Sequence, residues 1–253
     1  MYLSIITCTK NSEKFIEKNI NSVLNQKFRN YEHIIIDGES TDKTHQIVKK
    51  YLKITDKIKF FKFPPKGISN AFNKGLEKAC GDYIFFLNSD DYFYDDKVLQ
   101  DVYTFLKNND IDWVYGKINV IEESGKSVSR FPKIKLFQIA SKNLLKYINY
   151  IPHQAVFMKK KLFENYGLFD ETLTSKMDYD LWLRIAGKTG WRFFDRTISN
   201  FTIREGSQGS AMEKLEENRN NLKRVRNRYL NKLELYVAGI SDILIRKYNK
   251  TLR

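Results

Sequence analysis

The stretch at residues 81–96, GDYIFFLNSDDYFYDD, constrains the fold of this chain most strongly. Residues 83–87 are all apolar or aromatic, and so short a run between polar turns predicts a fully buried strand. The acidic turn Asn-Ser-Asp-Asp follows at residues 88–91. Adjacent carboxylates repel each other, and a divalent cation offsets that repulsion because hard cations bind carboxylate oxygens. Ligands of open α/β sheets bind beyond the carboxyl ends of strands, so this turn predicts a ligand site. A solvated, Asp-rich turn is the alternative.

Composition sets the broad class of the protein. The 253 residues are 42% hydrophobic and 14% aromatic, which is enough for a packed core in one large domain or one domain with an appendage. Two cysteines, Cys8 and Cys80, have no metal-binding spacing and favour a reducing, cytoplasmic setting. We expect no signal peptide and no membrane span, since no basic leader precedes the first apolar run and no stretch reaches ~18 apolar residues.

The formal net charge of +14 is large. It indicates a polyanionic partner, which could be nucleic acid, an anionic membrane surface or phosphorylated small molecules. Solubility alone is the other explanation, and charge does not separate them.

The first half of the chain alternates between strand and helix patterns. Short apolar or β-branched runs predict strands at residues 3–7, 31–36, 58–61 and 83–87. Apolar residues at helical spacing predict three helices between them, the first capped by Asn11 or Ser12 and the second by Thr41 or Asp42. Strands that alternate with helices imply parallel pairing with right-handed crossovers, and hence an α/β fold.

The second half has a less regular pattern. It predicts strands at 113–121, 155–158 and 191–194, and helices after Asp96, at 134–147, at 160–166 and from Asp178. From residue 211 onward, apolar residues keep a helical period among 11 basic and 5 acidic side chains. A basic amphipathic helix of this kind can lie on an anionic membrane. Packing on its own domain or on a second subunit are the alternatives.

Four carboxylates stand near the ends of predicted elements. Asp37 ends the second strand, Asp90 and Asp91 end the fourth, and Asp178 starts a later helix in the same half as His153. A parallel sheet brings such ends to one edge. Transfer from a phosphorylated donor uses such a set: one carboxylate orients a base or ribose, one anchors a metal on a diphosphate, and one accepts a proton from the attacking hydroxyl.

Five segments, in this order, resemble the family 2 glycosyltransferases, which have the GT-A fold. They are LSIITCTKNS from residue 3, HIIIDGESTDKT from residue 33, GISNAFNKGLEKACGDYIFFLNSDD from residue 67, IPHQAVFMKK from residue 151 and MDYDLWLRIA from residue 177. The resemblance covers residues 3 to roughly 201. It implies a Rossmann-like, mainly parallel central sheet flanked by helices, with a C-terminal helical extension.

The resemblance also implies a nucleotide-binding set. Asp37 matches the carboxylate that contacts the base, and Thr7 and Thr9 match residues of the same pocket. Asn70 stands where relatives often have an aspartate. Asp90 matches the residue that holds the ribose hydroxyls.

The remaining site residues concern the metal and the chemistry. Asp91 matches the ligand of Mn²⁺ or Mg²⁺, and Asp178 matches the general base. His153 would contact the diphosphate or the acceptor. Two positions depart from the usual motifs, because Asn88 replaces an aspartate and Met177 replaces a glutamate.

These features predict an inverting, metal-dependent glycosyltransferase. It would move a sugar from a nucleotide sugar, most simply a UDP-sugar, to a hydroxyl of a saccharide or lipid-linked saccharide in cell-surface polysaccharide synthesis, such as capsule or O-antigen. Alternatives are a catalytically silent glycan- or nucleotide-binding relative and a nucleotidyltransferase, although the loop TCTKNS lacks the glycine that the latter needs. A nucleic-acid-binding protein is a further alternative, but zinc, helix-turn-helix and aromatic-basic signatures are missing from the sequence.

The predicted organisation has two parts. Residues 1–210 would form the GT-A domain, with a nucleotide-sugar-binding half at 1–95 and an acceptor half at 96–210, and residues 211–253 would form the helical tail. We expect a cytoplasmic protein in peripheral contact with the inner face of the cell membrane, or a homodimer through the tail, and no nucleic acid partner. Residues 204–209, REGSQG, loosely resemble a flexible glycine-serine loop and receive no role.

Overall fold

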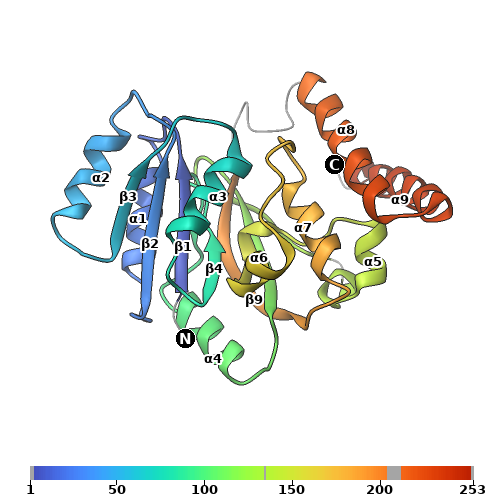
Figure 1. The fold of residues 1–253 in the computed structure, drawn as a ribbon, viewed down its shortest axis with the longest axis horizontal. Helices are drawn as coiled ribbons and strands as arrows, with labels where there is room; N and C mark the ends of the chain where they lie inside the picture. The colour runs from blue at the N-terminus through green and yellow to red at the C-terminus, as the bar shows by residue number, and fades with distance from the viewer. Residues whose placement is uncertain (1–2, 134, 204–211, 252–253) are drawn as a thin grey trace.

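A nine-stranded mixed sheet forms the centre of the computed structural model, which describes residues 3–133, 135–203 and 212–251 (Figure 1). The strands lie in the order β3-β2-β1-β4-β8-β6-β9-β5, and β7 pairs with β6. Their bounds are β1 Leu3–Thr9, β2 Tyr31–Asp37, β3 Ile58–Lys62, β4 Tyr83–Phe86, β5 Tyr92–Phe93, β6 Trp113–Glu122, β7 Ser127–Phe131, β8 Val156–Lys159 and β9 Trp191–Ile203. Residue 134 and the segment at 204–209 lie outside the described residues.

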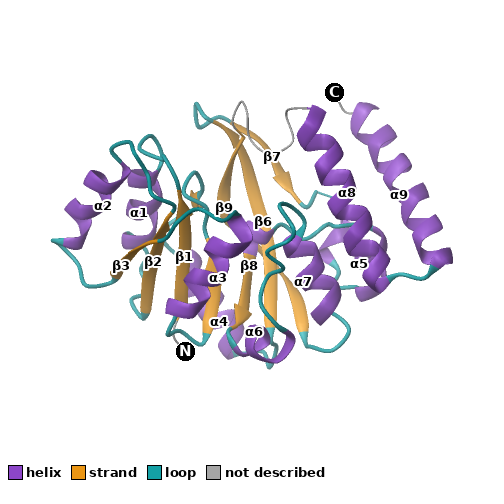
Figure 2. Cartoon of the chain, turned by 45° about the horizontal axis from the view of Figure 1, so that its top comes forward, coloured by secondary structure: helices purple, strands orange, loops and turns teal. Residues whose placement is uncertain are grey.

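Helices cover both faces of the sheet (Figure 2). Helices α3, α6 and α7 pack on one face, and α1, α2 and α4 pack on the other. The bounds are α1 Ile16–Leu24, α2 Thr44–Leu52, α3 Ile68–Lys78, α4 Val98–Lys107, α5 Lys142–Tyr147, α6 Lys161–Tyr166, α7 Met177–Ile185, α8 Met212–Tyr229 and α9 Lys232–Thr251, with short 3-10 helices η1 Lys135–Gln138 and η2 His153–Ala155.

The parallel pairing of the first half is confirmed. Strand β1 pairs in parallel with β2 and β4, and β2 pairs in parallel with β3. Successive side chains of β1 enter opposite cores, Ile5 on the α1 side and Ile6 on the α3 side. Helix α3 lies directly on β1, because a Cβ added to Gly75 would come within 2.3 Å of Ile6 Cγ2. The carboxyl ends of β1, β2 and β4 therefore lie beside the start of α3.

The second half mixes the two strand directions. Strand β8 runs antiparallel to β4 and β6, whereas β9 runs parallel to β6. The strand predicted at 191–194 is longer than expected, because β9 stays paired with β6 up to Glu122 after register shifts near Lys117. This extension brings Phe201 and Thr202 to the end of β4, where the Thr202 hydroxyl donates to the backbone oxygen of Asp90 at 2.6 Å.

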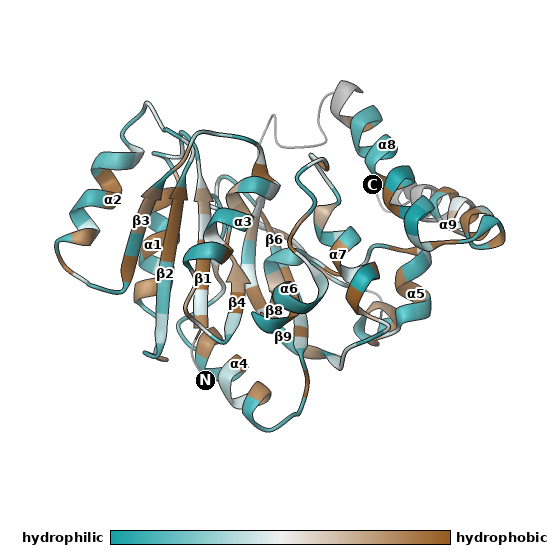
Figure 3. Cartoon of the chain, in the orientation of Figure 1, coloured by the Kyte–Doolittle hydropathy of each residue, from teal (hydrophilic) through white to brown (hydrophobic). Residues whose placement is uncertain are grey.

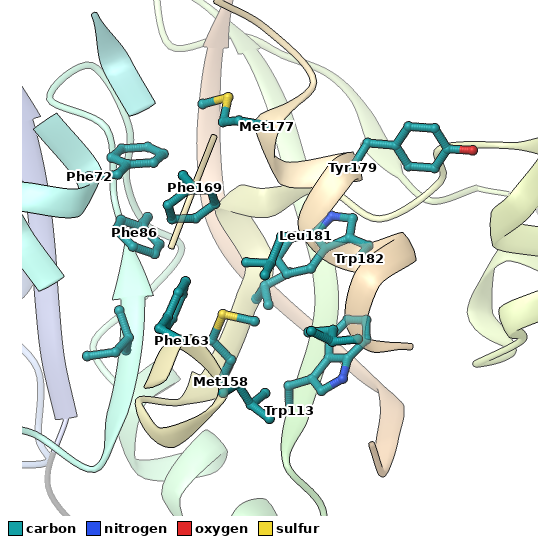
Figure 4. Close-up of a cluster of buried hydrophobic side chains, with 14 of the residues drawn as sticks. Phe72, Phe86, Trp113, Met158, Phe163, Phe169, Met177, Tyr179, Leu181 and Trp182 are labelled. Carbon is teal, nitrogen blue, oxygen red and sulfur yellow. The ribbon is translucent and has the colours of Figure 1, made fainter. Parts of the chain in front are cut away.

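Figure 3 shows hydrophobic colours along the strands of the sheet. Aromatic side chains fill the core between the sheet and helices α3, α6 and α7 (Figure 4). Phe72 of α3 packs on Phe86 of β4, with ring centroids 4.4 Å apart. Trp182 of α7 stacks on Trp113 of β6 at 5.2 Å. Trp182 is therefore a core residue, and its packing fixes α7, which begins with Met177, against the sheet.

Two predicted local features are wrong. The helix predicted at 134–147 is interrupted: η1 is followed by a break before α5, where the Ser141 side chain accepts from Leu144 N and so caps the new helix. The Tyr150 hydroxyl lies 3.1 Å from the Ser141 backbone nitrogen, inside that break. The predicted caps of the first two helices are also wrong, since the N-cap residue is Phe15 in α1 and Lys43 in α2, and neither has a capping side-chain hydrogen bond. The Asp42 carboxylate does accept from the Thr44 N–H at 2.9 Å, one residue before that N-cap.

The predicted helical tail is divided in two. Helix α8 ends at Tyr229, and the Asn231 and Glu234 side chains each accept the other's backbone N–H at 2.9 Å, a capping box that starts α9. The tail packs on its own domain, as Lys146 of α5 pairs with Glu234 at 2.7 Å. No helix within the described ranges is long and apolar enough to cross a bilayer. The division at residues 95 and 210 stays a prediction.

His33 makes the stability of this fold sensitive to acid. It is fully buried in β2, with Nε2 2.9 Å from Thr7 Oγ1, and burial lowers its pKa from 6.5 to about 3. Between these values the unfolded chain binds a proton that the native protein does not, so the free energy of unfolding is highest above pH 6.5 and falls as the pH drops. The expected loss is about 1.4 kcal/mol per pH unit from this group.

We expect His33→Gln to remove this part of the acid sensitivity. Urea unfolding at pH 7 and pH 5 measures it in both proteins. Equal pH dependence in the wild-type and variant proteins would show that another group is responsible.

Candidate active site

Two adjoining pockets form a cleft at the carboxyl ends of β1, β2 and β4. The first pocket, of about 460 Å³, lies between the ends of β1 and β2, the loop after β3 and the start of α3. The second pocket, of about 530 Å³, lies between the end of β4, η2, the start of α7 and the end of β9. Cys8, Lys10 and Ile68 line both pockets, so the two form one continuous site.

The second pocket brings together three of the predicted site residues. Asp90 follows β4, His153 begins η2 and Asp178 lies in the first turn of α7, and all three line this pocket. Asp90 and Asp178 are the two of these residues that lie farthest apart in the sequence. The order of the strands explains why these three residues lie together. Strand β4, which precedes Asp90, is next to β8, which follows His153, and α7 packs on the face of the sheet that α3 and α6 cover.

Asp178 and His153 form the polar centre of the second pocket. His153 Nδ1 lies 3.6 Å from Asp178 Oδ2, and both side chains are about one-fifth exposed. The Asn88 amide nitrogen lies 3.3 Å from His153 Nε2. When that amide donates, the imidazole proton sits on Nδ1 and faces the carboxylate. His153 is thus placed to orient Asp178, a role that the sequence did not suggest.

The surroundings of Asp178 keep it ionised. Burial is the largest influence on its pKa and disfavours the charged form, but the contacts around the carboxylate, those with His153 first among them, together outweigh burial, and the pKa of the carboxyl lies below the ordinary value. Lys176 and the backbone N–H of Tyr179, which donates to Asp178 Oδ1 at 2.7 Å, lower this pKa further. The carboxylate is therefore in the form that accepts a proton at neutral pH.

Asp90 and Asp91 have different positions although they are adjacent. Asp90 lines the second pocket. Asp91 is 1% exposed, and its Oδ1 accepts from the backbone nitrogen of Thr202 at 3.1 Å. The Asn19 side-chain amide donates to the backbone oxygens of Asn88 and Asp91, and so it holds the turn that carries both aspartates. The structure therefore turns Asp90, the predicted ribose residue, toward the cleft and Asp91, the predicted metal ligand, into the interior.

Asp37 and Thr7 also lie behind the cleft wall. Both are fully buried. The Asp37 carboxylate accepts from the Ser40 hydroxyl and backbone N–H at 2.5 and 3.0 Å, and lies 2.5 Å from His45 Nε2. The Thr7 hydroxyl donates to Asn19 Oδ1 at 3.3 Å and lies 2.9 Å from His33 Nε2. Both side chains therefore shape the ends of β1 and β2 from within.

Thr9 and Asn70 line the first pocket. The Thr9 hydroxyl is buried and has no hydrogen-bond partner among the described residues, so a bound ligand could satisfy it. The Asn70 amide donates to Glu171 at 2.9 Å, which leaves its carbonyl oxygen for a ligand.

Several lining residues were not predicted. Ser12 and Ser89 contact each other at 2.8 Å and join the ends of β1 and β4. Lys176 has φ 65°, a left-handed conformation that is costly for a non-glycine residue and is often found at functional sites. Phe201 and Asn218 close the far side. Positive φ and contacts between distant segments leave no pattern in the sequence, so only the structure could identify these residues.

A divalent cation fits this cleft when it arrives with a diphosphate. Mg²⁺ commonly binds through one or two carboxylates together with substrate phosphates. Asp90 is the carboxylate of the acidic turn that lines this pocket, whereas the Asn88 amide donates to Asp91 Oδ2 at 3.4 Å. Within the described part of the chain, no group of three His, Cys, Asp or Glu residues could hold an ion without other ligands. Lys10 and Lys176 line the same pocket and favour an anionic ligand.

Comparison with known proteins identifies the class. The family model described as glycosyl transferase family 2 matches residues 4–167, about two-thirds of the chain. The chain therefore belongs to glycosyl transferase family 2, and the resemblance read from the five segments is confirmed.

Individual relatives are similar over different shares of the chain. An uncharacterized glycosyltransferase of Rickettsia bellii is 30% identical over 81% of this chain and 31% of its own length. The poly(ribitol-phosphate) beta-N-acetylglucosaminyltransferase TarP of Staphylococcus aureus is 38% identical over 51% of this chain and 39% of its own length. The chain thus spans well under half of the length of these two relatives.

Solved structures confirm the GT-A fold. S. aureus TarS 1-349, in complex with UDP-GlcNAc, has a TM-score of 0.73 at 24% identity and covers 89% of this chain and 65% of its own. The mannosyltransferase PcManGT from Pyrobaculum calidifontis, in complex with GDP-Man and Mn²⁺, has a TM-score of 0.65 at 14% identity, over 94% of this chain and 73% of its own.

Proposed function

We propose that this protein transfers a sugar from a UDP-sugar, with inversion, to a hydroxyl of a saccharide or lipid-linked saccharide used in cell-surface polysaccharides. One observation carries the proposal: Asp90, His153 and Asp178 line the second pocket, which continues into the first pocket, where the buried Thr9 hydroxyl has no hydrogen-bond partner among the described residues. The nucleotide would occupy the first pocket and the reacting sugar the second. The UDP-GlcNAc complex of TarS, a structural neighbour, supports the choice of nucleotide.

The proposed chemistry assigns one task to each side chain. Asp178 takes the proton of the acceptor hydroxyl. At the same time, the oxygen of that hydroxyl forms a bond to the anomeric carbon from the face opposite the diphosphate. The bond from the anomeric carbon to the diphosphate breaks, and the electron pair leaves with the nucleoside diphosphate. His153 orients Asp178. A Mn²⁺ or Mg²⁺ ion, held by Asp90, would neutralise charge on the diphosphate when bound.

Donor binding is expected to stabilise the fold. A ligand that binds only the native protein at about 100 times its Kd adds roughly 2.7 kcal/mol, or about 5–10 °C in Tm for a chain of this size. UDP-sugars with Mn²⁺ should give this shift, and GDP- and dTDP-sugars should give less. Thermal unfolding with each nucleotide sugar, with and without EDTA, measures it. A protein that responds to none of them would refute the proposed function.

We also propose that α9 contacts an anionic membrane, which is where a lipid-linked acceptor would lie. One face of α9 is apolar and exposed, formed by Leu233, Tyr236, Val237, Ile240 and Ile243, which are 38–72% exposed. Lys232 is exposed at its start, and the sequence adds Arg246, Lys247 and Lys250 further along the helix. Apolar and basic residues together on one helix suit binding to anionic lipid headgroups.

Vesicle flotation tests this contact. We expect the protein to bind phosphatidylglycerol-containing vesicles, and Ile240→Glu to weaken binding about tenfold, since burying one such side chain contributes ~1.5–3 kcal/mol. Leu52→Glu, an exposed leucine on α2, is the matched control and should bind as the wild type does. A dimer in sedimentation that Ile240→Glu dissociates, without vesicle binding, would instead assign this face to a second subunit.

A further inference from the structure

Helix α8 reaches the active site from the C-terminal part of the chain. Asn218 of α8 lines the second pocket together with Lys176, Asp178 and Phe201. Figure 1 shows α8 standing beside α7, which carries Asp178. Helix α8 also contacts the segment that precedes α7, at residues 170–176. The predicted tail is therefore part of the site wall.

Side chains along one face of α8 bind this segment. Glu217 accepts from the Thr174 hydroxyl at 2.5 Å. Asn221, only 4% exposed, donates to Thr174 Oγ1 at 2.8 Å and to Ser175 Oγ at 3.1 Å. Residues three or four apart lie on the same face of a helix, so Asn218 shares a face with Asn221, three residues later, and is next to Glu217 in the sequence. These hydrogen bonds fix the position of Asn218 in the wall of the second pocket.

A second group of contacts ties α8 to α7 itself. Arg228 pairs with Asp170 at 2.7 Å and with Asp180 of α7 at 3.0 Å. The Tyr229 hydroxyl also lies 3.0 Å from Asp180 Oδ1. Asp180 is 1% exposed, so its charge needs these partners. Helix α8 is thereby held at two points along its length, and Asn218 keeps a defined position in the pocket that Asp178 also lines.

We propose that Asn218 is a specificity-determining residue that hydrogen-bonds a hydroxyl of the acceptor sugar; this rests on the proposed function. The candidate base Asp178 must lie beside the attacking hydroxyl, and Asn218 lines the same pocket as that base. The lining of the first pocket, which would hold the nucleotide, comes from β1, β2 and residues 63–71 and includes no α8 residue. A carboxamide both donates and accepts, which matches a sugar hydroxyl. The acceptor subsite therefore lies between α7 and α8.

The test compares Asn218→Ala with Asn220→Ala, an exposed asparagine two residues further along α8. Aryl glycosides of glucose, galactose and N-acetylglucosamine serve as acceptors, and the best wild-type acceptor is used for kinetics. Loss of one hydrogen bond should raise the acceptor KM of Asn218→Ala about three- to tenfold. The donor KM, the rate of donor hydrolysis and the Tm should stay at wild-type values, and Asn220→Ala should be unchanged throughout.

The outcomes separate the two proposals. Wild-type transfer with an acceptor KM that is the same in both variants overturns the role of Asn218 and leaves the proposed function standing. A raised donor KM in Asn218→Ala also overturns it, because the residue would then contact the donor. Wild-type protein that neither hydrolyses nucleotide sugars nor transfers to any glycoside overturns the proposed function itself.

Discussion

Replacing Asp178 with asparagine is expected to lower kcat by about 10³-fold while donor binding stays unchanged. Proton removal by a positioned side chain contributes typically 10²–10⁴-fold, and a carboxamide cannot accept the proton. The substitution keeps the shape of the side chain and the hydrogen bond from Tyr179 N. Steady-state transfer rates and the donor-induced rise in Tm measure the two quantities separately.

The pH profile gives an independent check on Asp178. Its pKa lies below the ordinary value of 3.8, so the carboxylate remains charged as the pH falls toward that value. The decrease in kcat on the acidic side of the pH profile, which reports protonation of Asp178, should therefore occur below pH 3.8. Asp110→Asn, at an exposed carboxylate that precedes β6, is the control and should keep wild-type kinetics. Near-normal turnover of Asp178→Asn would remove Asp178 from the mechanism.

The second large effect concerns the two adjacent aspartates. We expect Asp90→Ala to weaken cation-dependent donor binding by at least about 100-fold, because even the loss of an outer-sphere partner costs 10–100-fold in metal affinity. Asp91→Ala should instead lower the free energy of unfolding by about 1–3 kcal/mol, since the buried Thr202 N–H loses its acceptor.

Titration of donor with Mn²⁺ and with EDTA, together with urea unfolding, distinguishes these variants. The sequence motif assigned the metal to Asp91, whereas the direction of the side chains favours Asp90. If Asp91→Ala loses cation-dependent binding and keeps its stability, the motif assignment is right and the proposed role of Asp90 is wrong.

Local patterns were sufficient for much of the architecture. The apolar runs that form β1 to β4 and the helical stripes between them were readable, because strand and helix periods depend on residues within a few positions of each other. The capping box of Asn231 and Glu234 is equally local, yet the long apolar stripe around it suggested one helix. The family segments then placed the site at the carboxyl ends of these strands, where the cleft lies.

The sequence by itself determined most of the elements, their parallel order in the first half and the family. Only the tertiary structure decided which carboxylates face the cleft, that His153 pairs with Asp178, and that α8 forms a wall of the site. The physical reason is that these features depend on contacts between residues that are far apart in the sequence. Whether Asp90 or Asp91 points outward depends on Asn19 and Thr202, contacts that span 72 and 111 residues of the sequence. Such contacts form only after the sheet has assembled, and periodicity along the chain carries no record of them.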